Sequence, residues 1–81
     1  MFDNLKQLAK MKELKAALEK ERREIEKEGV RVVVNGKMEI EELSLNPQLE
    51  LAKQQDLVKD CINQAMKEVQ QEAVRRMFQG N

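Results

Sequence analysis

The spacing of the apolar residues changes twice along this chain of 81 residues, and these changes constrain the fold more than any other feature. Before Gly29 there is neither Gly nor Pro, and apolar residues from Met11 to Ile25 recur at helical spacings of three, four and seven. From Val30 to Glu41 apolar residues recur at every second position on each side of Asn35-Gly36, as in two strands, and beyond Asp56 the helical spacing returns. We therefore predict one α+β domain in which a long helix, a short antiparallel β-hairpin or three-stranded sheet, and a second long helix follow one another.

The pattern also predicts where each element begins and ends within the single domain, 1–81. Gly29 is expected to end the first helix in a left-handed conformation, and Asn46-Pro47 is expected to end the sheet. The predicted elements are a helix over 3–28, strands over 30–34 and 37–41, a third short strand over 43–45, and a helix over 56–78.

The hairpin loop is predicted to be the three-residue segment 34–36 with a glycine bulge. This loop pairs Val32 with an apolar residue of the next strand, whereas a two-residue Asn-Gly turn would pair Val32 with Glu39. In the three-residue register Arg31 faces Glu39 across the strands. The alternation then breaks after Glu41, which predicts a bulge before the third strand.

The apolar hairpin favours pairing between two copies of the chain. A domain of this size buries little surface, the only aromatic residues are Phe2 and Phe78, and a lone hairpin is marginal in water. Strands placed edge to edge in a homodimer would enlarge the sheet and remove an exposed edge from each copy, while the helices project. The residues predicted at this interface are Val30, Val32, Val34, Met38, Ile40, Leu43 and Leu45.

The residue types needed for most catalysis are missing. There is no histidine, Ser44 is the only serine, there is no threonine, and the three glycines lie far apart. These absences exclude a serine–histidine nucleophile and a glycine-rich phosphate loop. We expect no catalytic residue, metal site, cofactor or small-molecule substrate, so the chain is predicted not to be an enzyme.

Two features have a chemical and a plain interpretation. The acids at 39, 41 and 42 could hold a divalent metal, but a solvated strand face and bend is the favoured interpretation. Cys61 lies in the apolar stripe of the second helix and is expected to be a small buried residue rather than a reactive thiol.

The chain is expected to work in the cytoplasm and away from membranes. No apolar run approaches the ~18 residues of a membrane span, and no basic-then-apolar signal pattern follows Met1. The lone cysteine cannot form an intramolecular disulfide, which agrees with a reducing compartment.

The central and C-terminal parts of the chain carry an ordered set of short motifs, in the segments VRVVVNGKMEIEELSLNP, residues 30–47, and DLVKDCINQAMKEV, residues 56–69. The motifs are Asn35-Gly36 after a valine-rich strand, the acidic-apolar strand from Met38 to Ile40, Asn46-Pro47, Leu57-Val58 and Asn63-Gln64-Ala65. In their order and spacing these segments resemble the YbaB/EbfC family of bacterial nucleoid-associated proteins. The resemblance implies an α-β-β-β-α fold and a homodimer formed through the sheets. It further implies helices that project like the arms of tweezers around double-stranded DNA, a location in the nucleoid, and no catalytic residue or cofactor.

The charge pattern allows DNA binding without requiring it. Fifteen basic and fifteen acidic residues leave no net charge, so affinity for phosphate must come from local clusters near the two helix ends. The candidate DNA contacts are Lys6, Lys10, Lys12, Lys15, Arg22, Arg75 and Arg76. Lys15 and Arg22 would share a helix face. From charge alone the favoured alternative is structural, with the lysines on a solvated face, helical pairs such as Lys20 with Glu24, and the arginines beside the negative end of a helix dipole.

The family resemblance outweighs the charge pattern and implies duplex binding by a homodimer that affects nucleoid organisation or gene expression. With few aromatic residues and no basic recognition helix, we predict weak sequence preference, through phosphate contacts and DNA shape. The alternative is a protein-interaction adaptor whose long helices bind a partner protein. A third interpretation, an enzyme with carboxylate-bound metal, requires acids that converge on one pocket.

Overall fold

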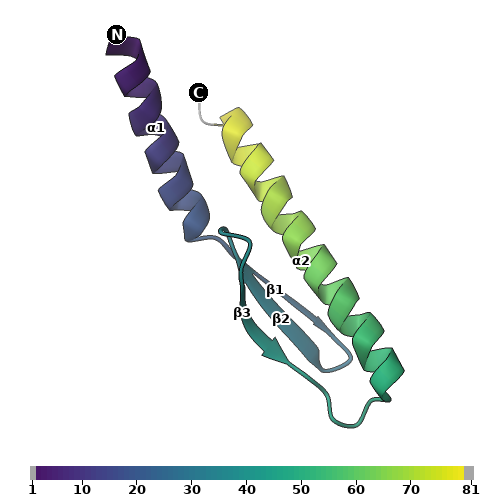
Figure 1. Cartoon of the computed structure of the whole chain (residues 1–81). Coiled ribbons are helices and arrows are strands. Elements are labelled where there is room, and N and C mark those ends of the chain that lie inside the picture. The colour runs from purple at the N-terminus through teal and green to yellow at the C-terminus, as the bar shows by residue number, and fades with distance from the viewer. Residues whose placement is uncertain (1, 80–81) are drawn as a thin grey trace.

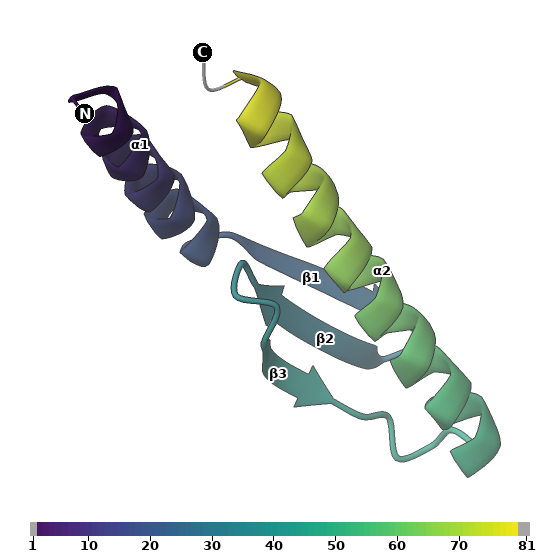
Figure 2. The ribbon, with the colours of Figure 1, turned by 45° about the horizontal axis from the view of Figure 1, so that its top comes forward.

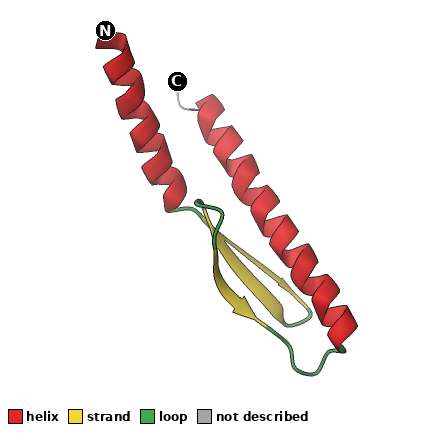
Figure 3. Ribbon diagram, viewed as in Figure 1, coloured by secondary structure: helices red, strands yellow, loops and turns green. Residues whose placement is uncertain are grey.

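The computed structural model describes residues 2–79 and contains two helices and a three-stranded sheet (Figure 3). In chain order the elements are α1 Phe2–Glu19, β1 Arg22–Lys27, β2 Val30–Asn35, β3 Ile40–Ser44 and α2 Leu51–Gln79. The strands are antiparallel in the order β1-β2-β3, and α2 lies along one face of the sheet (Figure 1). The predicted α+β fold class is confirmed.

The core lies between α2 and the sheet. Cys61, Ala65 and Val69 repeat every four residues on one face of α2, and they pack against the buried face of β1 and β2. The sheet contributes Ile25, Val30, Val32 and Val34. Complete burial of each valine contributes about 1.5–3 kcal/mol, so this layer is the main source of stability. The chain's own helix therefore covers the three valines predicted at a dimer interface.

The two helices extend well beyond the sheet. At about 1.5 Å per residue the 29 residues of α2 span roughly 43 Å, whereas a six-residue strand spans roughly 20 Å. α1 leaves the sheet at the same end, so that the two helices run side by side away from it (Figures 1 and 2). The radius of gyration is 16.7 Å, against about 12 Å for a compact domain of this length. The chain is an elongated body rather than a closed globule.

The prediction of one helix over 3–28 is wrong beyond Glu19. The helix tightens at its end, where the Lys20 N–H donates to Ala17 O and the Glu21 N–H donates to Leu18 O. Residues 22–27 then pair with β2 along their whole length. Their alternation was hidden, because only Ile25 is apolar among the residues that face α2. Pairing with β2 outweighs the helical propensity of this charged segment.

The prediction that Gly29 ends a helix is wrong, because Gly29 completes the turn between β1 and β2. Glu28 and Gly29 both have positive φ, 49° and 87°, as a type I′ turn requires. The Asn46 amide donates from Nδ2 to Glu28 O at 2.9 Å and lies against the glycine, where a Cβ would be 2.8 Å from Nδ2. The turn is thus fixed from outside the hairpin.

The loop between β2 and β3 has the predicted length but lies two residues later than predicted. The Asn35 N–H donates to Glu39 O at 3.0 Å, which closes a loop over 36–38 in which Met38 takes the left-handed conformation, φ 65°. The predicted pairing of Arg31 with Glu39 is therefore wrong, because Arg31 lies opposite Ser44. The apolar register is nonetheless kept, since Val34 pairs with Ile40 and so faces the same side.

The irregularity predicted after Glu41 exists but does not begin a third strand over 43–45. Between Val33 and Val34 the register shifts, so that Glu41 is an extra residue and β3 continues to Ser44. The third strand of the sheet is β1. The second helix begins at Leu51, five residues before the predicted residue 56. Its first turns are joined to the preceding loop by a hydrogen bond from the Asn46 N–H to Gln54 Oε1 at 2.6 Å.

Candidate nucleic-acid interface

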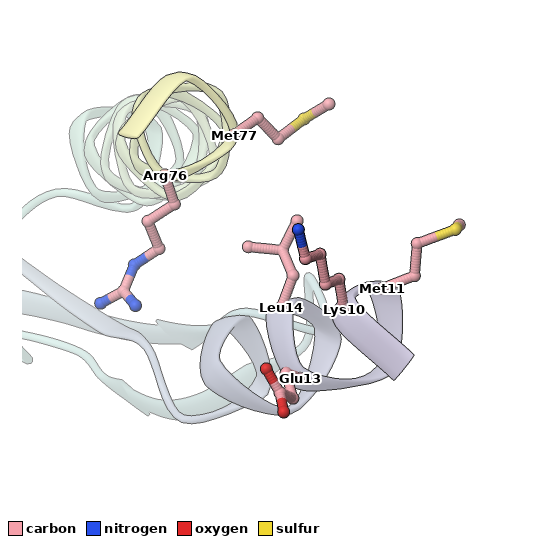
Figure 4. Close-up of a pocket in the computed structure, with 6 residues that line it drawn as sticks. All are labelled: Lys10, Met11, Glu13, Leu14, Arg76 and Met77. Carbon is pink, nitrogen blue, oxygen red and sulfur yellow. The ribbon is translucent and has the colours of Figure 1, made fainter. Parts of the chain in front are cut away.

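A cleft of about 470 Å³ lies between the middle of α1 and the C-terminal end of α2. It is lined by Lys10, Met11, Glu13, Leu14, Arg76 and Met77. In Figure 4 Lys10 and Leu14 point from α1 towards α2, while Arg76 extends from α2 towards the junction of α1 and β1. The cleft thus combines one lysine, one arginine and one glutamate with apolar walls.

The lysines of α1 are solvent-exposed but do not share one face. Lys10, Lys12 and Lys15 are all exposed. Because successive residues turn by about 100° around a helix, Lys10 and Lys12 lie on nearly opposite sides of α1. Lys6, also predicted to contact DNA, has a side chain that lies outside the described part of the structure. A duplex beside α1 can therefore meet only part of this set at one time.

Arg75 and Arg76 lie in an ionic network instead of projecting freely. Arg75 Nη2 donates to Glu72 Oε1 at 2.6 Å, and Arg76 Nε donates to the same oxygen at 3.3 Å. Arg76 Nη2 also donates to Glu21 Oε1. Arg23 completes the network, with Nη1 3.1 Å from Glu21 Oε2 and Nη2 3.4 Å from Glu72 Oε2. These five residues, named here the arginine network, tie the start of β1 to the end of α2.

Hydrogen bonds and opposite charges favour the ionised forms of Glu72 and Arg75 in this network, and they outweigh the effect of burial. Hydrogen bonding from Arg75, together with the charges around it, holds the pKa of the Glu72 carboxyl below its usual value, although burial opposes this. The same bond raises the pKa of Arg75. Three guanidinium groups face two carboxylates, so the arginine network carries one net positive charge.

Arg22 lies apart from both groups. It belongs to β1, so the predicted helix face shared with Lys15 does not exist, nor does the predicted helical pair of Lys20 with Glu24. Arg22 Nε lies 2.9 Å from Glu41 Oε1 on the next-but-one strand. The structure brings Arg76 to the same cleft as Lys10 and places Arg22 elsewhere.

Sequence reasoning missed the acidic half of the arginine network. Glu72 is 8% exposed and continues the buried stripe of Ala65 and Val69 at helical spacing. A charged residue at a position where the stripe predicts an apolar one was the available signal. Glu21 and Arg23 gave no signal, because the segment that holds them was assigned to a helix.

A second surface lies at the open edge of the sheet. Among residues 2–79 β3 pairs with β2 alone, and Ile40, Leu43 and Leu45 are about half exposed. A groove of about 390 Å³ runs between β3 and the first turns of α2. Its lining is mainly apolar: Leu43, Leu45, Leu51, Val58, Gln54, Gln55 and the stem of Lys59. This set is named here the edge groove.

The remaining chemical candidates are accounted for within residues 2–79. The described residues contain no group of acids, cysteines or histidines that could hold a metal ion. Glu42 instead binds Arg31, and Glu41 accepts from Asn35 Nδ2 at 3.0 Å. Cys61 is buried as predicted, and burial raises the pKa of its thiol. In this part of the chain neither helix has an apolar stretch long enough to cross a bilayer.

Comparison with known proteins agrees with the resemblance seen in the sequence. A sequence model described as the YbaB/EbfC DNA-binding family matches residues 1–79, nearly the whole chain. Comparisons with curated proteins and with solved structures gave no match.

Proposed function

The chain belongs to the YbaB/EbfC DNA-binding family, and on this premise we propose that it binds double-stranded DNA as a homodimer. The family match over residues 1–79 carries the proposal. In a bacterial cell it would act in the cytoplasm as part of the nucleoid and influence nucleoid organisation or gene expression. The exposed lysines of α1 and the net positive charge of the arginine network support contact with phosphate.

Weak sequence preference is part of the proposal. Base readout in the major groove needs side chains that project from one face of an inserted helix or ribbon. The lysines of α1 are instead distributed around the helix, and Arg76 is held by Glu21 and Glu72. Such groups suit phosphates, which carry no sequence information. The affinity should therefore be modest and strongly dependent on salt.

Two observations support a second copy of the chain as the occupant of the edge groove. β3 offers unpaired backbone groups beside exposed Ile40 and Leu43, and such an edge invites strand pairing. The exposed surface is 6390 Å², against about 5,000 Å² for a compact protein of this mass. The excess of roughly 1,300 Å² exceeds the ~800 Å² that each partner buries in an interface of standard size. Since α2 covers the valines of β2, the side chains left for the interface are Met38, Ile40, Leu43 and Leu45.

A gel-shift titration of duplex DNA across a range of salt concentrations tests the proposed function. We expect micromolar binding at low salt that weakens steeply as salt rises. Replacing Lys10, Lys12 and Lys15 together by Gln should weaken binding. The matched control replaces Lys37, Lys53 and Lys67, which are exposed outside α1 and outside the edge groove, and so removes the same charge from other surfaces. An affinity for DNA that does not change with salt concentration, or an equal loss of affinity in both triple variants, contradicts the proposal.

The alternative function as a protein adaptor also has a structural observation in its favour. The free ends of the helices expose Leu8 and Met11 on α1, and Met77 and Phe78 on α2. Apolar residues gathered beside a cleft are typical of surfaces that bind proteins. An adaptor should leave duplex DNA unshifted at micromolar concentration, so the same titration separates the two functions.

A further inference from the structure

We infer that Glu72 is an internal competitor for phosphate: its carboxylate occupies guanidinium groups that DNA would otherwise bind, and thereby limits the affinity for DNA. The inference rests on the proposed DNA-binding function and deepens it by naming the residue that tunes it. It starts from the observation that both C-terminal arginines predicted to contact DNA bond to this one acid.

The bonds to Glu72 have the form that a phosphate would adopt. One carboxylate oxygen accepts from Arg75 at 2.6 Å and from Arg76 at 3.3 Å, while the other lies 3.4 Å from Arg23. Carboxylate and phosphate oxygens bind guanidinium groups in the same geometry, often through two bonds. A phosphate that approaches these arginines therefore competes directly with Glu72.

Exposure shows which arginine can exchange partners. The Arg75 side chain is 63% exposed, whereas that of Glu72 is 9% exposed. Arg75 can thus turn from the buried acid to a phosphate in solvent without leaving the surface. Arg76 is less exposed and also held by Glu21, so it is expected to stay in place. The competition therefore concerns mainly Arg75.

The charge of the arginine network gives the size of the effect. Loss of the Glu72 charge changes the network from one to two net positive charges. In water a unit charge at ~7 Å from a phosphate changes the affinity by about threefold, or about tenfold for a dimer that carries two networks. If Arg75 gains one phosphate per chain, the slope of log affinity against log salt becomes steeper by about 0.9 per chain.

The variant Glu72→Gln isolates this effect, because glutamine keeps an acceptor oxygen and a similar volume. Asp60→Asn is the matched control: it removes one negative charge from the exposed surface of α2, three turns away. At that distance, roughly 18 Å along the helix, its charge is largely screened at 0.1 M salt. DNA affinity and its salt dependence are measured for both variants and for the unchanged chain, with circular dichroism to verify folding.

We expect Glu72→Gln to bind duplex DNA about tenfold more tightly with a steeper salt dependence, and Asp60→Asn to bind like the unchanged chain. If the unchanged chain binds but Glu72→Gln gains no more than Asp60→Asn, the inference is overturned and the proposed function stands. If only Glu72→Gln binds, the inference is supported. If neither the unchanged chain nor Glu72→Gln binds DNA at low salt, the inference and the proposed function are both overturned.

A second variant serves if Glu72→Gln does not fold. Glu21→Gln removes the other acid of the arginine network, which accepts from Arg23 and Arg76. It raises the net charge of the network by the same amount but leaves Arg75 bonded to Glu72, so tighter binding with little change in the salt dependence supports the inference. An affinity equal to that of Asp60→Asn overturns it.

Discussion

Replacing Gly36 by alanine should disturb the contact that holds α1 against the hairpin. Gly36 lies in the β2–β3 loop, and its N–H donates to Glu21 O at 3.0 Å. A Cβ at this position would overlap the backbone carbonyl of Leu18 and come within 3.1 Å of Glu19 N. The carbonyl cannot turn away freely, because it accepts the Glu21 N–H. Either the loop or the end of α1 must move.

The expected loss of unfolding free energy combines two alternative costs and one gain. Forcing extra atoms into a packed site typically costs 1–3 kcal/mol, and overlap with rigid backbone belongs at the upper end. Separation of the loop from α1 would instead lose a hydrogen bond of about 1 kcal/mol and weaken the link between Glu21 and Arg76. The smaller entropy of an unfolded chain with alanine returns about 0.4–1 kcal/mol. We expect a net loss of about 2 kcal/mol.

Chemical denaturation at a fixed chain concentration measures this loss of unfolding free energy. At about 2.1 cal/mol/K of unfolding entropy per residue, a chain of this length should lose roughly 12 °C in Tm. Lys37→Ala is the matched control, because Lys37 is exposed in the same loop and its truncation should change stability by less than about 0.5 kcal/mol. If Gly36→Ala were as stable as the unchanged chain, α1 would not pack where the structure places it.

Four further predictions follow from other parts of the structure. Glu28→Asn should stabilise the chain by about 0.5 kcal/mol in denaturation, because asparagine accepts the positive φ of the β1–β2 turn more readily and the surface pair with Lys53 contributes little. Leu43→Glu should shift the sedimentation coefficient towards that of a monomer; Leu8→Glu, also exposed but outside the edge groove, should not. The Cys61 thiol should react with a thiol reagent only as fast as the chain unfolds, and reaction at the unfolded-state rate would contradict its burial. The pKa of Glu72 is lower in the folded state, so the stability that its charge contributes is fully present above the unfolded pKa of about 4.3 and is lost as pH falls through the folded pKa. The difference in unfolding free energy between the unchanged chain and Glu72→Gln should therefore shrink below about pH 4. A difference that stays constant with pH would refute this.

The parts of the fold that the sequence predicted are those in which one element carries its own pattern. Val30, Val32 and Val34 recur at every second position of β2, and the apolar stripe of α2 runs from Val58 to Met77. Each pattern is long enough to identify the element without knowledge of its neighbours. The family resemblance supplied the same order of elements.

β1 could not be predicted because its pattern depends on its neighbours. Its inward positions hold Arg23, Ile25 and Lys27, and the two basic stems are only partly buried. Taken alone, this segment of charged residues and one isoleucine favours a helix. It becomes a strand because β2 offers six pairing positions and because the turn at Glu28 and Gly29 is held by Asn46. These contacts exist only once the chain has folded.

The candidate site was predicted in part for the same reason. The exposed lysines of α1 can be listed from charge alone, but the partners of Arg75 and Arg76 depend on how β1 lies against α2. Glu72, a charged residue within an apolar stripe, was the one sequence signal of an ionic contact, and it was not among the predicted site residues. The edge groove requires knowledge of which strand lies at the edge of the sheet.

Sedimentation equilibrium of the chain mixed with a short DNA duplex at low salt tests the central claim most directly, because one mass reports both pairing and DNA binding. The account predicts a complex that contains the duplex and two chains, about 19 kDa of protein, and that dissociates as salt rises. A free monomer of 9.5 kDa beside unbound duplex would contradict it.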